Sequence, residues 1–304
     1  MMYLQIGLQT ALPAVLIFMQ WRSRPANKLK WVLDSLVSFL VLLLLFMGAR
    51  WDMTSYYLRV LLFPLFGLAS FVAYRRIVAA ESTQFRLRLL LENGVNLVLI
   101  LVLGWMNIIL LNGRFYPGEA VNLAYPLRSG VFYVGGGGSS RWINNHHAFP
   151  PQDYALDIVG LNAAGRPFLT DSTNLEGYAI FGEPIYSPCD GTVLAVENGR
   201  SDLTPPHTDS ANPAGNYVLI ACHDVEILLA HMQQESIQVN PGQTVAEGEL
   251  LGAVGNSGNS SQPHLHIHAE QSAVSGKILD GQGVPITFDN HFLVRNSLFT
   301  GRGE

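Results

Sequence analysis

"SSQPHLHIHAE", residues 260–270, places three of the chain's nine histidines at alternate positions, His264, His266 and His268. Along a β-strand, residues i and i+2 point to the same face, so these three side chains are expected to share one surface. Histidine is the commonest metal ligand, and catalytic zinc sites use three protein ligands and a water molecule. The stretch alone therefore allows two interpretations: a solvated strand face or the wall of a metal site.

A carboxylate that suits such a site is Asp157, in "YALDIVG". Apolar residues flank it on a predicted strand, and a carboxylate buried alone is costly, so Asp157 is expected to have a partner. All nine histidines follow residue 145, which places every candidate ligand of this type in the second half of the chain.

The composition limits the class of protein. Hydrophobic residues make up 49% of the 304 residues and charged residues 13%, whereas a soluble domain carries about 25% charged residues. A net charge of −5 argues against nucleic acid as a partner, because a basic surface is expected there. The two cysteines, Cys189 and Cys222, either form one bridge in an oxidising compartment or stay as two buried thiols.

Residues 1–112 hold four long apolar stretches. A helix needs about 20 apolar residues to cross a bilayer, and these stretches predict four transmembrane helices in the lipid bilayer, at about residues 2–20, 31–49, 56–74 and 95–112. Buried helices of a larger soluble protein are the alternative. The first stretch also admits a signal peptide, although a basic segment does not precede it.

Lysine and arginine predict the orientation of these helices. The loops after the first and third stretches carry the basic residues, namely Arg22, Arg24, Lys28, Lys30, Arg75, Arg76, Arg86 and Arg88. Basic loops stay in the cytoplasm, so both termini and the second half of the chain are expected outside it.

From residue 113 the character of the chain changes. Residues 113–140, which include "YVGGGGSS", are interpreted as a flexible or tightly turning linker. Residues 141–304 contain short β-branched runs separated by Gly, Pro and Asn. This pattern predicts a mainly β domain of antiparallel sheets.

Several segments of this half match one family in order: "ALDIV", "PIYSPCDGTVLAV", "GNYVLIACHD", "LLAHMQ" and "VNPGQTVAEGELLGAVGNSGNSSQPHLHIH". Over about residues 145–270 the chain resembles the lysostaphin-type zinc endopeptidases, which cut peptide cross-bridges of bacterial peptidoglycan. The resemblance implies that family's fold, a Zn²⁺ cofactor and hydrolysis of peptide bonds through a zinc-bound water. It does not extend to the apolar half.

The resemblance also implies roles for individual residues. His266 and Asp157 match zinc ligands, and His264 and His231 match catalytic histidines. The family's other histidine ligand lies four residues before the aspartate, where this chain has Asp153. Members with a longer loop take that ligand from further upstream, and a resemblance to their "N-x-H" placement, here Asn144 to His146, favours His146, with His147 as the alternative. His268 is expected to orient the site or to face water.

Together these observations predict a zinc metalloendopeptidase that is anchored in the bacterial inner (cytoplasmic) membrane and acts on peptidoglycan from the extracytoplasmic or periplasmic side. The alternative is a catalytically inactive domain of the same fold that binds peptidoglycan or another partner, which the missing histidine at position 153 supports. A transporter or sensor is disfavoured, because the spans hold few ionisable residues. The sequence does not indicate which protein partners the chain has.

Overall fold

The computed structural model describes residues 2–77, 83–272 and 274–301, with side chains from residue 6 and, after the gap, from residue 90. The chain forms two compact units, Met1–Leu111 and Asn112–Glu304. The side chains of Arg86 and Arg88, from the second predicted basic loop, lie outside this description.

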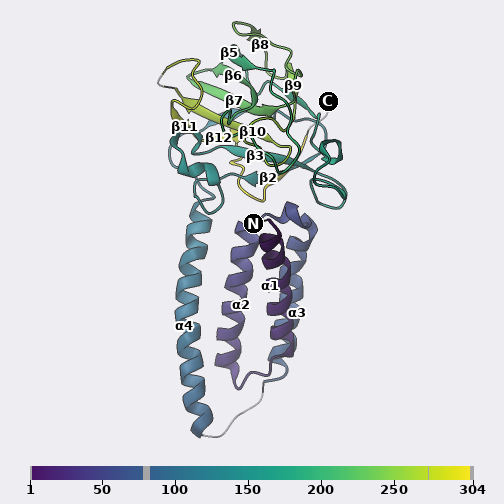
Figure 1. Cartoon of the computed structure of the whole chain (residues 1–304). Helices are drawn as coiled ribbons and strands as arrows, with labels where there is room; N and C mark the ends of the chain where they lie inside the picture. The colour runs from purple at the N-terminus through teal and green to yellow at the C-terminus, as the bar shows by residue number, and fades with distance from the viewer. Residues whose placement is uncertain (1, 78–82, 273, 302–304) are drawn as a thin grey trace. The chain divides into compact units, whose positions relative to one another are not determined.

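The first unit is helical (Figure 1). Its elements are α1 (Met2–Arg22), α2 (Lys28–Gly48), the short 3-10 helix η1 (Trp51–Met53), α3 (Tyr56–Tyr74) and α4 (Thr83–Asn112). Among the described residues, Lys28–Gly48, Tyr56–Tyr74 and Leu90–Asn112 are long and apolar enough to cross a membrane. The first predicted span falls in α1, whose side chains are described only from residue 6.

Polar side chains tie these helices together. Gln20 of α1 donates to Ser35 of α2 at 2.8 Å, and Ser35 lies 3.0 Å from Ser70 of α3. Asn107 of α4 donates to the Leu40 carbonyl at 3.1 Å. Each pairing satisfies a polar group that would be costly to leave unpaired among apolar neighbours.

The second unit is a β domain, which confirms the predicted mainly β, antiparallel class. One antiparallel sheet has the strand order β13-β2-β3-β10-β7-β6-β5-β8, with β11 beside β10, and Figure 1 shows most of this order. Its strands are β2 (Val131–Gly136), β3 (Leu156–Leu161), β5 (Gly191–Glu197), β6 (Asn216–Cys222), β7 (Val225–Met232), β8 (Thr244–Val245), β10 (Leu265–Gln271), β11 (Gln282–Val284) and β13 (Leu298–Thr300). Two further pairs are β1 (Val121–Leu123) with β12 (Ile286–Phe288), and β4 (Pro184–Tyr186) with β9 (Leu250–Ala253).

Residues 113–140, interpreted from sequence as a linker, are part of this domain. They contain β1 and β2, and β2 lies inside the large sheet between β3 and β13. The glycine run suggested a flexible segment because glycine weakens a strand interior. Here Gly136 is needed for space: a Cβ on it would lie 2.9 Å from the Asp157 carboxylate.

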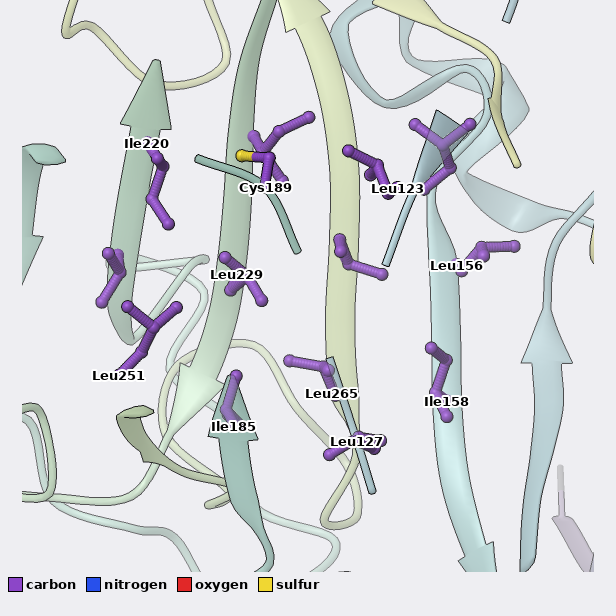
Figure 2. Close-up of a cluster of buried hydrophobic side chains, with 14 of the residues drawn as sticks. Leu123, Leu127, Leu156, Ile158, Ile185, Cys189, Ile220, Leu229, Leu251 and Leu265 are labelled. Atoms are coloured by element: carbon purple, nitrogen blue, oxygen red, sulfur yellow. The ribbon is translucent and has the colours of Figure 1, made fainter. Parts of the chain in front are cut away.

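The main core lies on one face of the large sheet. Leu156 and Ile158 of β3, Leu265 of β10 and Leu229 of β7 meet there, as Figure 2 shows. Because side chains alternate along a strand, the residues between these leucines and isoleucines project from the other face. That face carries Asp157, His266 and His268.

Cys189 and Cys222 are both buried in this core and form a disulfide. Of the two alternatives that the sequence left open, the structure therefore contains the bridge. Disulfides form and persist in oxidising compartments.

Candidate metal centre

Strand pairing brings Asp157 and His266 together. The two residues lie directly opposite each other on the antiparallel strands β3 and β10. The imidazole Nδ1 of His266 is 3.0 Å from Oδ1 of Asp157. The register of β3 against β10 thus brings together two residues that are 109 positions apart in the sequence.

His146 reaches the same carboxylate from the loop before β3. It lies in the 3-10 helix η2 (Asn145–Ala148), and its Nε2 is 3.0 Å from both oxygens of Asp157. Its Nδ1 is 3.1 Å from Oε1 of Gln152, in the 3-10 helix η3 (Pro150–Gln152). Since an amide oxygen only accepts, Nδ1 of His146 carries a proton, so the neutral form of this ring would turn the lone pair of Nε2 toward the centre.

The buried Asn144 sets the course of this loop. Its side-chain oxygen accepts from the backbone N–H of His146, and its amide group donates to the carbonyls of Gly138, Asp153 and Ala155. His147 points elsewhere, with Nδ1 3.3 Å from Oδ1 of Asp153. The structure therefore places His146 at the cluster and His147 beside the residue that occupies the usual ligand position.

His231 enters the site through a β-bulge. Asn216 pairs with Met232 and Tyr217 with Ala230, so His231 is the extra residue on β7. Its φ of 62° lies in the left-handed region, where a non-glycine residue costs about 1–3 kcal/mol. Such bulges re-aim a side chain, and here the ring centroid of His231 lies 4.7 Å from that of His264 and 5.7 Å from that of His266.

Backbone carbonyls fix the proton position on His231 and His264. Nδ1 of His231 is 2.9 Å from the Ser257 carbonyl, and Nδ1 of His264 is 2.8 Å from the Gln262 carbonyl. Both Nδ1 atoms must donate, so each neutral ring keeps an unprotonated Nε2. Nε2 of His264 lies 3.5 Å from Oδ1 of Asp157, which directs it toward the cluster.

Burial and charge set the ionisation of the cluster. Burial alone would raise the pKa of Asp157, but His146 and His264 outweigh it and hold that pKa well below its usual value. Burial lowers the pKa of His266 to about 3 and, together with His264 and His266, lowers that of His231 well below its usual value. At neutral pH the site therefore presents the Asp157 carboxylate with neutral imidazoles at His231 and His266, which are the forms that bind metals or accept protons. Asp157 in turn raises the pKa of His146 against the effect of burial.

Two overlapping groups of donor atoms converge here, each within 4.8 Å: His146, Asp157 and His266, and His231, His264 and His266. The first group, two imidazoles and a carboxylate with free lone pairs, fits the donor set of a catalytic zinc site with an open position. A cavity of about 80 Å³ adjoins the cluster. Its lining residues are His146, Gln152, Pro213, Ala214, Leu228, Ala230, His231, Asn259 and His266.

The sequence did not single out Gln152, Ser257 or Gly136, although the first two contact a predicted site residue and the third makes room for one. Only Asn144 had a local signal. It stands two residues before His146, and its side chain caps the start of η2 by accepting from the His146 N–H.

The model of peptidase family M23 matches residues 175–279, which include His231, His264 and His266. The chain carries a peptidase family M23 domain. The resemblance to lysostaphin-type peptidases is thereby confirmed, while Asp157 and His146 lie upstream of the matched segment.

The M23 domain has curated relatives. It is similar to an uncharacterized metalloprotease of Haemophilus influenzae, with 36% identity over 96 residues, which cover 31% of this chain and 18% of the relative. It is also similar to the peptidoglycan DD-endopeptidase ShyA of Vibrio cholerae, with 34% identity over 85 residues, which cover 28% of this chain and 17% of ShyA. The chain thus spans less than a fifth of either relative.

Solved structures similar to the M23 domain include lysostaphin from Staphylococcus simulans, at 18% identity and a TM-score of 0.30, covering 54% of this chain and 52% of lysostaphin. The M23 metalloprotease pseudoalterin is another, at 20% identity and a TM-score of 0.34, covering 57% of this chain and 79% of pseudoalterin.

Proposed function

We propose that this chain is a membrane-anchored zinc metalloendopeptidase that hydrolyses peptide bonds of bacterial peptidoglycan. The observation that supports it most is the convergence of His146, Asp157 and His266 on one point, with the unprotonated Nε2 atoms of His231 and His264 beside it. The substrate is inferred from the M23 domain and from a relative named as a peptidoglycan DD-endopeptidase.

In this proposal His146, Asp157 and His266 hold Zn²⁺. When bound, zinc would polarise a scissile carbonyl and lower the pKa of water at its open position. His264 would take the proton from the attacking water through Nε2, because its Nδ1 proton is held by the Gln262 carbonyl. His231, whose ring centroid lies 4.7 Å from that of His264, would accept a proton on its own Nε2 and then donate it to the charged oxygen or to the leaving amine.

The helical unit would anchor the enzyme in the inner membrane. Support comes from the three described helices that are long and apolar enough to cross a bilayer. The Cys189–Cys222 disulfide supports placement of the catalytic domain on the oxidising, extracytoplasmic side.

The test uses the full chain purified in detergent. It is incubated with sacculi of several cross-link types, and newly exposed amino groups are counted with zinc, with a chelator and after zinc is restored. We expect release that the chelator stops and zinc restores. His264→Ala should be inactive, whereas His207→Ala, at an exposed histidine outside the cavity, should match the wild type.

Absence of release from every type of sacculus, by folded protein supplied with zinc, would contradict the proposal. Sacculus binding without hydrolysis would then favour the inactive binding domain.

A further inference from the structure

The face of β10 that carries His266 continues with two more polar residues. His268 and Glu270 follow at the next alternate positions, with only 1% and 0% of their surfaces exposed. Nδ1 of His268 lies 3.0 Å from Nε2 of His266. Such a buried polar row is costly unless its members satisfy one another.

The direction of the first contact follows from the proposed zinc site. His266 turns Nδ1 to the cluster, 3.0 Å from Asp157. As a ligand through Nδ1, it must carry its proton on Nε2, and this N–H needs an acceptor. The Gln152 side chain is not this acceptor. Its amide oxygen accepts from His146, and its amide nitrogen, 3.4 Å from Nε2 of His266, is a donor. Nδ1 of His268 is therefore the acceptor.

The second contact follows from the first. If His268 accepts through Nδ1, its own proton lies on Nε2. This buried nitrogen has no hydrogen-bond partner among the described residues, and Oε1 of Glu270 lies 3.9 Å from it. The Glu270 carboxylate also accepts from the backbone N–H groups of Leu279 and Gly281, at 2.9 and 3.0 Å. The carboxylate is thus held in place and attracts the Nε2–H group without a formed hydrogen bond.

We propose that His268 and Glu270 are positioning residues that hold His266 as a zinc ligand. His266 donates from Nε2 to His268, and His268 presents its Nε2–H to Glu270. This relay fixes the ring of His266 and keeps the proton off the nitrogen that faces Asp157. The inference rests on the proposed function, because it assumes that His266 binds zinc.

The strand beside β10 supplies a matched control. Glu226 of β7 lies directly opposite Glu270 and is also buried. Its carboxylate instead accepts from Ser272 at 2.7 Å, Ser275 at 2.8 Å and the N–H of Gly276 at 3.0 Å. Glu226→Gln therefore removes the same charge and disturbs the same loop, but it does not touch the relay.

The experiment measures zinc affinity of the full chain in detergent by competition with a chromophoric chelator. His268→Leu removes the acceptor and should weaken zinc binding about 10–100-fold, as is typical for residues that hold a metal ligand. His268→Asn keeps an acceptor near Nδ1 and should recover most of the affinity. Glu270→Gln should show a smaller loss, and Glu226→Gln none.

A second readout needs no variant. In zinc-loaded wild type labelled with ¹⁵N-histidine, NMR should show His266 and His268 both protonated on Nε2. Protonation of His268 on Nδ1 would overturn the relay, as would wild-type affinity in His268→Leu or an equal loss in Glu226→Gln and Glu270→Gln. Failure of the wild type to bind zinc would instead contradict the proposed function, so the two failures can be told apart.

Discussion

At the scale of single residues, Asp157 organises the site. It contacts His146 and His266 at 3.0 Å and His264 at 3.5 Å. One carboxylate thus lies against two proposed ligands and one proposed catalytic histidine. Substitutions should therefore distinguish metal binding from proton transfer, because only the proposed ligands hold the metal.

Asp157→Ala should abolish hydrolysis and weaken zinc binding by more than about 100-fold. This exceeds the loss of zinc affinity that is usual when a residue that only supports a ligand is replaced. His264→Ala should retain zinc while kcat falls by about 10²–10⁴-fold. Metal analysis of the purified variants and amino-group release from sacculi measure the two effects. Undiminished hydrolysis by His264→Ala would remove its proposed role.

Gly136→Ala should damage the centre without replacing a ligand. The added Cβ would lie 2.9 Å from Oδ2 of Asp157, so the carboxylate must move. We expect zinc affinity to fall about 10-fold or more, as for other changes next to a ligand. Gly199→Ala is the control, because its nearest neighbour would be 3.9 Å away. Equal zinc affinity in both variants would contradict the argument.

At the scale of elements, the bulge in β7 depends on Ser257. The Ser257 hydroxyl accepts from the N–H of Asn216 at 2.9 Å and donates to the Met232 carbonyl at 2.8 Å, so it bridges the two strands at the bulge. The Ser257 carbonyl also holds His231. The turn 255–258 therefore aims one proposed catalytic histidine.

Ser257→Ala should lower the free energy of unfolding by about 1–3 kcal/mol, because it leaves buried backbone groups without partners. Hydrolysis per folded molecule should fall more than zinc affinity, since His231 is not a proposed ligand. Ser236→Ala also removes side-chain hydrogen bonds to the backbone of Gln233 and Ala253, outside the cavity lining, and should leave hydrolysis unchanged. Denaturant unfolding measures the stability of the two variants, and amino-group release measures their hydrolysis. Equal hydrolysis by Ser257→Ala and Ser236→Ala would contradict the prediction.

At the scale of the whole molecule, the disulfide bears on the compartment as well as on stability. Cys189 and Cys222 are 33 residues apart in the chain. A cross-link that closes a loop of this length stabilises a domain by about 2–4 kcal/mol. The proposed extracytoplasmic domain should therefore keep the bridge in cells.

Protein alkylated during lysis should show both thiols blocked from the reagent until a reductant is added. The Cys189→Ala/Cys222→Ala variant should lose about 2–4 kcal/mol of unfolding free energy in the β domain, measured by denaturant titration. Reduced wild type serves as the matched control. Alkylation of both thiols without reductant would count against the oxidising compartment.

Local patterns in the sequence determined much of this protein. Alternating apolar residues and turn residues predicted the antiparallel β domain, and long apolar runs predicted the helices, because both signals depend on neighbours along the chain. The order of the motifs predicted the M23 resemblance, and their residue types predicted the metal chemistry. His268 was expected on the same face as His266, either orienting the site or facing water, and the structure buries it beside His266.

Tertiary structure decided what depends on contacts between distant segments. Strand register set Asp157 opposite His266, and Asn144 turned the upstream loop so that His146 rather than His147 reaches the carboxylate. The first two glycines of the run that suggested a linker end strand β2, where Gly136 leaves room for Asp157. A bulge turned His231 toward His264. Pairing register, bulges and steric room are properties of packed strands, so a linear pattern cannot specify them.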